Sequence, residues 1–174
     1  MNYFISDLHF SHKNIIKFER TEFPTIEEHD QYIIKSINRK VKNTDTLYIL
    51  GDIGEVSLVR QLNGRKILLK GNHDKRSNKE YLGYFAEVYD NPFYFNRRIL
   101  LSHFPHPVED HILNVHGHMH NSIMSKDNYL NLSAKMVNYT PISEKELTGI
   151  VNKLPKENRK FMEEWFAPYY KWIK

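Results

Sequence analysis

The chain has 174 residues, no cysteine and a formal net charge of +4. At this length we expect one domain, residues 1–174, whose core is large enough to need no covalent cross-links. The lack of cysteine excludes disulfides, thiolate zinc sites and cysteine nucleophiles, so a metal would be held by His, Asp, Glu or Asn.

Short β-rich runs alternate with amphipathic helices along the chain. In chain order, strands are expected at residues 2–6, 46–50, 66–70, 93–95, 99–102, 112–115 and 129–132. Helices are expected at residues 25–41, 55–62 and 78–85, after Ser143, and after Pro155. Strands and helices first alternate and then strands follow strands, which predicts an α/β fold with a mixed sheet or a pair of sheets.

The clearest helix signals lie at residues 25–41 and after Ser143. Thr25 and Glu28 form a capping-box pattern, and Ser143 and Glu146 repeat it. After Thr25, apolar residues recur at helical spacing and mark one buried face. They are Ile26, Ile33, Ile34, Ile37 and Val41.

Side chains that bind metals or protons follow five of the apolar runs. They are Asp7 and His9, then Asp52, then Asn72, His73 and Asp74, then His103, and last His118 and His120. In an open α/β sheet, sites lie outside the carboxyl ends of the strands, so these side chains are expected to meet along one rim. Gly51, Gly71 and Gly117 each precede one of them, and glycine permits a sharp strand exit or a close backbone approach to an ion.

These residues fall into ordered blocks between residues 7 and 120. The blocks are Asp7-Leu8-His9, Gly51-Asp52, Gly71-Asn72-His73-Asp74, Ser102-His103 and Gly117-His118-Met119-His120. As a set they resemble the signature of the calcineurin-like metallophosphoesterase superfamily, and the small size resembles its compact bacterial and phage members. The resemblance implies a four-layer α/β/β/α sandwich with mixed sheets and a binuclear metal site at the carboxyl ends of the strands.

The resemblance also implies how the ligands are divided. Asp7, His9 and His120 would hold one divalent metal, Asn72, His103 and His118 would hold a second, and Asp52 would bridge both. A bridging carboxylate offsets the repulsion of two cations about 3.5–4 Å apart. This set of imidazole, carboxylate and amide ligands favours Mn²⁺, with Fe²⁺, Ni²⁺ or Zn²⁺ as alternatives.

The implied reaction is hydrolysis of a phosphomonoester or phosphodiester by a hydroxide that bridges the two metals. His73 would protonate the leaving group, and Asp74 would orient the loop beside it. In the protein-phosphatase branch an Asp and an Arg follow the bridging Asp, but here Glu55 and Val56 stand there. This departure argues against a protein phosphatase and leaves the role of Glu55 open.

Contacts to the substrate must then come from other residues. His12, Lys13 and Asn14 follow the first ligand pair, at an expected helix N-terminus that favours anions. His106 lies in a rigid Phe-Pro-His-Pro turn near the second metal, where a substrate contact and a water-exposed histidine are equally expected. With no room for a cap domain, an open rim slightly favours phosphodiesters and nucleotide-like substrates.

Three further histidines receive no role in the reaction. His116 precedes Gly117 in a strand and is expected to be packed or to support a ligand. His29 on the first long helix and His111 before a strand are expected to be surface or structural residues.

The ends of the chain bear on location and partners. No basic leader opens the chain, and no apolar run approaches the roughly 20 residues of a membrane helix, so we expect a cytoplasmic protein without a membrane partner. Residues 153–174, expected to form a basic aromatic C-terminal helix, hold six Lys/Arg against three Glu. This segment most simply docks on the protein's own core, and a homodimer surface or base stacking on nucleic acid are alternatives.

Two other functions compete with the phosphoesterase. One is a non-catalytic scaffold with the same fold, which would be expected to lack His73 or some ligands, whereas all are present here. The other is a nucleic-acid-binding protein that uses the basic aromatic segment.

Overall fold

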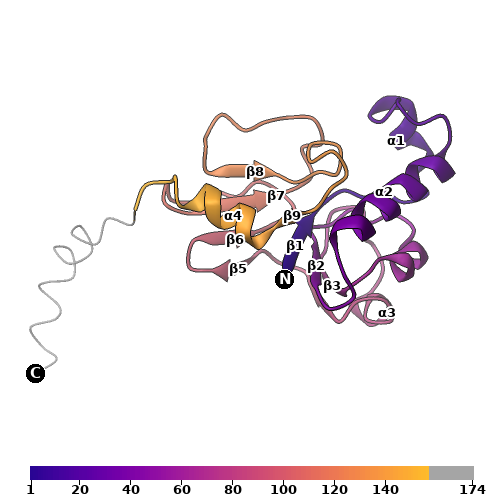
Figure 1. Cartoon of the computed structure of the whole chain (residues 1–174), viewed down its shortest axis with the longest axis horizontal. Coiled ribbons are helices and arrows are strands. Elements are labelled where there is room, and N and C mark those ends of the chain that lie inside the picture. Colours follow the sequence, from indigo (N-terminus) through magenta and orange to yellow (C-terminus); the bar gives the residue numbers. More distant parts are fainter. Residues whose placement is uncertain (157–174) are drawn as a thin grey trace, which may run out of the picture.

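Two β-sheets form the framework of residues 1–156, the part of the chain that the computed structural model describes (Figure 1). The first sheet has the strand order β4-β3-β2-β1-β9. Its strands are β1 (Asn2–Ile5), β2 (Thr46–Ile49), β3 (Arg65–Leu69), β4 (Glu87–Tyr89) and β9 (Ile142–Ser143). Strands β1 to β4 run parallel, and β9 is antiparallel to β1.

The second sheet has the strand order β5-β6-β7-β8. Its strands are β5 (Phe93–Asn96), β6 (Ile99–Leu101), β7 (Leu113–His116) and β8 (Tyr129–Asn131). Strands β6, β7 and β8 are parallel, and β5 is antiparallel to β6. The expected α/β fold with mixed sheets is therefore confirmed.

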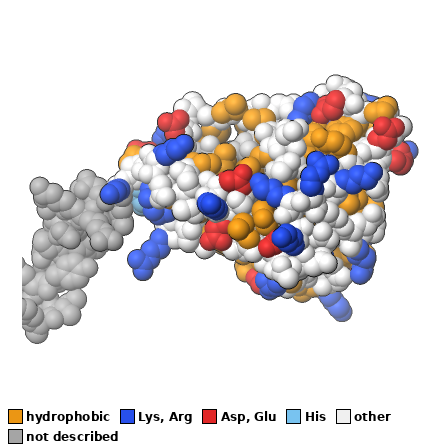
Figure 2. All heavy atoms as spheres, viewed as in Figure 1, with side chains coloured by type: hydrophobic (Ala, Val, Ile, Leu, Met, Phe, Trp, Pro, Cys, Tyr) orange, Lys and Arg blue, Asp and Glu red, His pale blue; other side chains and the backbone are white. Residues whose placement is uncertain are grey.

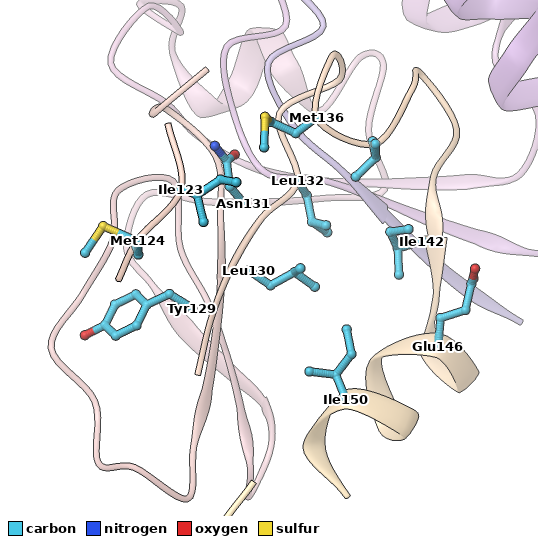
Figure 3. Close-up of a pocket in the computed structure, with 11 residues that line it drawn as sticks. Ile123, Met124, Tyr129, Leu130, Asn131, Leu132, Met136, Ile142, Glu146 and Ile150 are labelled. Atoms are coloured by element: carbon cyan, nitrogen blue, oxygen red, sulfur yellow. The ribbon is translucent and has the colours of Figure 1, made fainter. Parts of the chain in front are cut away.

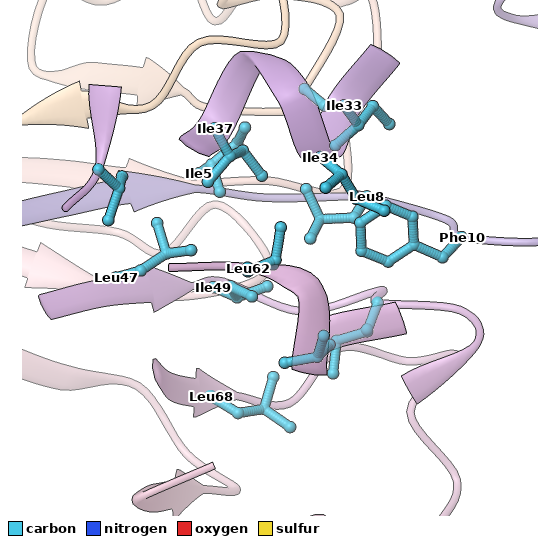
Figure 4. Packing of buried hydrophobic residues seen from close by; sticks show 14 of the residues in the cluster. Ile5, Leu8, Phe10, Ile33, Ile34, Ile37, Leu47, Ile49, Leu62 and Leu68 are labelled. Carbon is cyan, nitrogen blue, oxygen red and sulfur yellow. The ribbon is translucent and has the colours of Figure 1, made fainter. Parts of the chain in front are cut away.

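Alternating side chains of the first sheet face two different cores. Tyr3 and Ile5 of β1 pack in one core, and Phe4 between them packs in the other, as the period of two in a strand requires. The first core also receives the apolar face of helix α2 (Ile26–Lys40), including Ile33 and Ile37 (Figure 4). The 3₁₀ helix η1 (Val56–Gln61) covers the same core.

The second core joins the two sheets. Phe4 and Leu69 of the first sheet pack there with Leu101 and Val115 of the second. Helix α4 (Glu144–Val151) adds its buried Leu147 to this core. Because both sheets share one apolar layer, the loops after their parallel strands are fixed relative to each other.

The helices follow the expected caps, with differences in length. The Thr25 hydroxyl accepts a hydrogen bond from the Glu28 N–H, and the Ser143–Glu146 capping box is complete in both directions. The expected helix at residues 78–85 is wrong in extent, because α3 (Asn78–Tyr81) ends just before Leu82 and Gly83. The helix expected at residues 55–62 is the 3₁₀ helix η1 (Val56–Gln61), with Glu55 as its N-cap and Leu62 as its C-cap.

The expected helix after Pro155 falls mainly on residues 157–174, which are outside the described residues. Up to residue 156, no helix has both the length and the apolar character that a membrane crossing requires.

Candidate metal centre

The loops that leave five parallel strands meet at one edge of the fold. Asp7 and His9 follow β1, Asp52 follows β2, Asn72 follows β3, His103 follows β6, and His118 and His120 follow β7. Their side chains form two groups of potential metal ligands, as the sequence predicts. The convergence follows from parallel pairing, which places the carboxyl ends of neighbouring strands on the same side.

The first group consists of Asp7, His9 and His120, whose ligand atoms all lie within 4.8 Å of one another. The Nε2 atoms of His9 and His120 are 3.3 Å apart. Asp7 Oδ1 lies 3.9 Å from His9 Nε2 and 3.8 Å from His120 Nε2. Asp7 and His9 are buried, and His120 is partly exposed.

The second group consists of Asp52, His103 and His118, again with ligand atoms within 4.8 Å. Asn72 belongs with this group, because its Oδ1 lies 2.9 Å from His103 Nε2 and 3.1 Å from His118 Nδ1. His103 Nδ1 faces the carbonyl oxygen of Leu50 at 2.8 Å, so Nδ1 carries the proton and donates. The lone pair of neutral His103 is then on Nε2, which points at the group.

The Asp52 carboxylate lies between the two groups. Its Oδ2 is 3.5 Å from His103 Nε2 and 3.9 Å from His9 Nε2. Its Oδ1 accepts a hydrogen bond of 2.9 Å from the backbone N–H of His73. One oxygen is thus fixed by the backbone, and the other is directed to the space shared by both groups.

Strained backbone marks the ligand loops. Asp7, His9, Asp52, His118 and His120 all have positive φ, between 43° and 65°. Such conformations cost energy in non-glycine residues and cluster at functional sites. Here they occur at five of the seven expected ligands.

Two of the expected glycines act in different ways. Gly51 has a φ of 93°, which is the left-handed region that glycine adopts easily. Gly117 does not have a positive φ, but a Cβ there would overlap Ser6 Oγ and the Asp7 carboxylate. Gly117 therefore permits close approach of the chain to Asp7.

Buried polar groups hold the ligand carboxylates in place. Asp74 accepts hydrogen bonds from the backbone N–H groups of Asp52, Ile53 and Gly71, at 2.8, 3.1 and 2.8 Å. It therefore joins the loops after β2 and β3 and positions Asp52, and its own carboxylate is fully engaged. Asp7 Oδ2 accepts from Ser133 Oγ at 3.0 Å, a contact that sequence reasoning missed because Ser133 lies 126 residues away.

The pKa shifts of these groups bear on metal binding. Burial lowers the pKa of His9 and of His118, so both imidazoles are held neutral. For Asp52, burial favours the protonated form, but the hydrogen bond and charge of protonated His103 outweigh it and lower its pKa. Burial opposes the protonation of His103, but Asp52 in turn outweighs it and raises the pKa of His103, so a cation bound to Nε2 would take the place of that proton. Neutral imidazoles and an ionised carboxylate are the forms that coordinate cations.

The spacing of these atoms fits divalent cations. Two ligands at right angles, each about 2.1 Å from a common ion, lie about 3 Å apart. The His9–His120 and Asn72–His103 separations of 3.3 and 2.9 Å are close to that value. In the second group, the lone pairs of Asn72 Oδ1 and neutral His103 Nε2 repel each other unless a cation or a proton lies between them. The donor set therefore fits two cation sites.

A cleft of about 310 Å³ opens beside the first group. His9, Ser11, His12, Glu55 and His73 are among the residues that line it. The side chain of His73 is 61% exposed, and its Nε2 lies 4.0 Å from Asp52 Oδ2. A molecule in this cleft can reach His73 and the edge of the ligand groups at once.

The expected substrate contacts are only partly found at this cleft. His12 is there, with its Nδ1 3.4 Å from His9 Nδ1, and it is the N-cap of helix α1 (Lys13–Phe18). Lys13 and Asn14 are exposed in the first turn of α1 and do not line the cleft. His106 is held by its backbone N–H, which donates to Asn114 Oδ1 at 2.8 Å.

Glu55 does not contact His73 among the described residues. Its Oε1 accepts a hydrogen bond of 3.0 Å from the Ser57 N–H, which caps η1, and its Oε2 lies 3.9 Å from Arg76. Glu55 is thus a helix cap on the cleft wall.

The three unassigned histidines differ in their surroundings. His116 is fully buried as expected, and its Nδ1–H donates to the carbonyl oxygen of Gly117. His111 is half-buried beside Glu109. His29 is fully buried inside a polar network, so a surface position for it is excluded.

A second pocket, of about 370 Å³, lies between β8 and α4 (Figure 3). It is lined mainly by apolar side chains, including Leu130, Ile142 and Ile150. Asn131 in its wall donates to the carbonyl oxygens of His120 and Ser122. This pocket therefore borders the loop of a ligand but contains none of the ligand groups.

Comparisons with known proteins identify relatives without assigning an activity. No family model matches the chain. The uncharacterized protein MJ1445 of Methanocaldococcus jannaschii is 31% identical over 175 residues, covering 87% of this chain and 91% of that protein. The gene 66 protein of Mycobacterium phage L5 is 30% identical over 164 residues, covering 70% and 78%. The crystal structure of a protein of unknown function, AQ665 from Aquifex aeolicus, matches with a TM-score of 0.69 and 31% identity over 86% of this chain and 98% of that one.

Proposed function

This chain belongs to the family of the archaeal protein MJ1445 and the mycobacteriophage gene 66 protein, and we propose that it is a phosphoesterase that depends on two divalent cations. One observation carries the proposal. Two groups of cation ligands flank Asp52, whose Oδ2 faces both of them. Paired divalent cations bridged by a carboxylate are typical of enzymes that cleave phosphate esters.

The fold supports a calcineurin-like metallophosphoesterase. In that superfamily, which the sequence motifs resemble, two sheets form the middle of a four-layer α/β/β/α sandwich. The apolar layer between the two sheets, with α2 over the first sheet and α4 packed on the second core, agrees with that arrangement.

The residues divide between the two cations as follows. Asp7, His9 and His120 would hold one, Asn72, His103 and His118 the other, and Asp52 both. When bound, the cations would supply an acidified water and offset the charge on the phosphoryl oxygens. Mn²⁺ is the first ion to test, with Fe²⁺, Ni²⁺ and Zn²⁺ as alternatives.

In this proposal, His73 would deliver a proton to the leaving group. Its imidazole projects into the cleft, and its backbone N–H holds Asp52, so it reaches the reacting region without being needed as a ligand. Asp74 fixes the two loops that carry Asp52 and His73. His12, whose ring lies 6.3 Å from the ring of His73, also lines the cleft and can donate a hydrogen bond to a phosphoryl oxygen.

An open cleft favours phosphodiesters over phosphomonoesters, because a second ester group finds room. Its lining of histidines and a serine offers hydrogen-bond donors to an anion. We propose nucleotide-like phosphodiesters as the substrate class.

Hydrolysis of three substrates tests the proposed function. An aryl phosphomonoester, an aryl phosphodiester and a 2′,3′-cyclic nucleotide are offered to the protein before chelation, after it, and after Mn²⁺ is added back. We expect chelation to abolish hydrolysis and Mn²⁺ to restore it, with the diesters cleaved fastest. Hydrolysis that persists in metal-free buffer contradicts the proposal, and inactivity toward all three substrates with two ions bound favours a non-catalytic scaffold. His111→Ala, beside Glu109 and away from the ligands, is the matched control and should behave as wild type.

A further inference from the structure

Glu19 lies behind one of the ligand histidines. His120 Nε2 faces the first ligand group, and His120 Nδ1 lies 3.4 Å from Glu19 Oε1. The other oxygen, Oε2, accepts a hydrogen bond of 2.9 Å from Asn121 Nδ2, which fixes the carboxylate. A carboxylate on the remote nitrogen of a metal-binding histidine sets its tautomer and ring orientation and raises its basicity.

Arg20, the next residue, supports the loop that carries the other two ligands of this group. Its side chain is buried and donates to the backbone carbonyl oxygens of Asp7 and Leu8, the latter at 3.0 Å. Asp7 and His9 have φ values of 55° and 50°, so the loop is in a conformation that needs such external support.

His29 and Asp30 extend the support to the far end of the same loop. Because a guanidinium only donates, His29 Nε2 accepts from Arg20 Nη1 at 2.8 Å, and His29 Nδ1–H donates to Asp30 Oδ1 at 2.8 Å. Asp30 Oδ2 then accepts from the Ser11 N–H at 2.9 Å. The loop from Asp7 to Ser11 is therefore held at both ends by one buried chain of hydrogen bonds.

The second ligand group has different supports. His103 is oriented by the Leu50 carbonyl oxygen, and Asp52 by Asp74 and the His73 backbone. Glu19, Arg20, His29 and Asp30 have no hydrogen bond or ion pair with Asn72, His103 or His118 among the contacts within residues 1–156.

We propose that Glu19, Arg20, His29 and Asp30 are positioning residues for one divalent-cation site, that of Asp7, His9 and His120. This inference rests on the proposed function, because it assumes that both groups bind cations. It makes the two sites unequal, since residues 19–30 contact the first group and its loop directly. Their link to the second group is indirect and runs through the His118 N–H, which donates to the Asp7 carboxylate. Loss of such outer partners typically weakens metal binding about 10- to 100-fold.

Calorimetric titration of the metal-free protein with Mn²⁺ alone tests the proposal. We expect two ions in the wild type, and in Glu19→Ala one site weakened about 10- to 100-fold with the other unchanged. Glu19 is partly exposed, so this variant is expected to fold. Equal affinities in wild type and Glu19→Ala overturn the inference, whereas a wild type that binds no pair of ions overturns the proposed function instead.

Two further variants make the result specific. Glu22→Ala removes a nearby carboxylate that accepts from Tyr139 Oη and pairs with Lys135, so both Mn²⁺ affinities should stay at wild-type values. Asp52→Asn should weaken both ions together, because its Oδ2 faces both groups. An equal loss of Mn²⁺ affinity in Glu22→Ala and Glu19→Ala would overturn the inference. Such a result would assign the effect to a general loss of stability around residues 19–22. Glu19→Gln keeps a hydrogen-bond acceptor but lacks the charge. Its affinity for the ion of the first site should therefore lie between the affinities of wild type and Glu19→Ala.

Discussion

One substitution separates the exposed imidazole of His73, the proposed general acid, from its backbone N–H, which holds Asp52. In His73→Ala the N–H that holds Asp52 Oδ1 is retained, so the ligands should stay in place. We expect kcat to fall about 100- to 10,000-fold, the usual contribution of a general acid, while two Mn²⁺ ions remain bound. Parallel measurement of kcat and of metal content checks this. Loss of a bound ion in this variant would instead indicate that His73 is a ligand. With a good aryl leaving group, which needs little protonation, the fall in kcat should be smaller.

The buried His29 makes stability depend on pH. Burial lowers the pKa of His29 below that of a free histidine, and the charge of Arg20 adds to this although Asp30 opposes it. The unfolded chain therefore takes up a proton near pH 6.5 that the native protein resists. The contribution of His29 is complete above about pH 6.5 and is lost as the pH falls below it.

The variant His29→Gln tests the predicted direction of this pH dependence. Urea unfolding of the metal-free wild type and variant at pH 7.5 and 5.5 gives four free energies of unfolding. We expect the wild type to lose more stability than the variant between the two pH values, because only the wild type carries this proton-sensitive group. If wild type and variant differ in free energy of unfolding by the same amount at both pH values, His29 is not the source of the pH dependence.

At the scale of elements, a helix marked by local sequence signals was predictable, whereas short strands defined by their pairing partners were not. Helix α2 was predictable because Thr25 caps it and its isoleucines repeat at helical spacing, both within one stretch of chain. Strands β4 and β9 were not predicted. β9 has only two residues, and its identity comes from Tyr3 and Phe4 of β1, which pair with Ser143 and Ile142.

Helix α4 offers a test of the local signals. Ser143 accepts from the Glu146 N–H, and the Glu146 carboxylate accepts from the Ser143 N–H. Ser143→Ala should lower the free energy of unfolding by about 1 kcal/mol, the usual value of an N-cap. Chemical denaturation measures this. Thr148→Ala, in the same helix but away from the cap, is the control and should cost less, because alanine favours helix.

At the scale of the whole molecule, the candidate ligands and the adjacent support Asp74 were predictable, whereas the distant supports Glu19 and His29 were not. Asp7, Asp52 and His103 stand at the ends of apolar runs, and parallel strands bring such ends together. Glu19 and His29 have no comparable signal, because each acts on a segment that only the folded chain brings near. The split among His12, Lys13 and Asn14 depends on where helix α1 turns away from the cleft, which is also a tertiary property.

The distribution of charged residues bears on nucleic-acid binding and on the deletion that tests it. Figure 2 shows Lys and Arg side chains scattered among acidic ones over one face, without a continuous basic patch. Residues 157–174 contain four Lys/Arg and three Glu. A deletion should begin after Lys156, because Leu154 is part of the second core and Arg98 donates to the Pro155 carbonyl oxygen.

The salt dependence of polynucleotide binding, measured for the full chain and for residues 1–156, tests whether residues 157–174 bind nucleic acid. If its four basic residues neutralised phosphates of a single strand, deletion would change the slope of log K against log salt by about 3. We expect the slope to change by less than about 1, because the three glutamates oppose those charges and the proposed substrates are small. Sedimentation of both proteins at the same concentrations shows whether deletion alters the oligomeric state, so that a lost dimer is not mistaken for lost nucleic-acid contacts. A change in slope near 3 with an unchanged oligomeric state would contradict the small-substrate assignment and favour a polynucleotide as the partner.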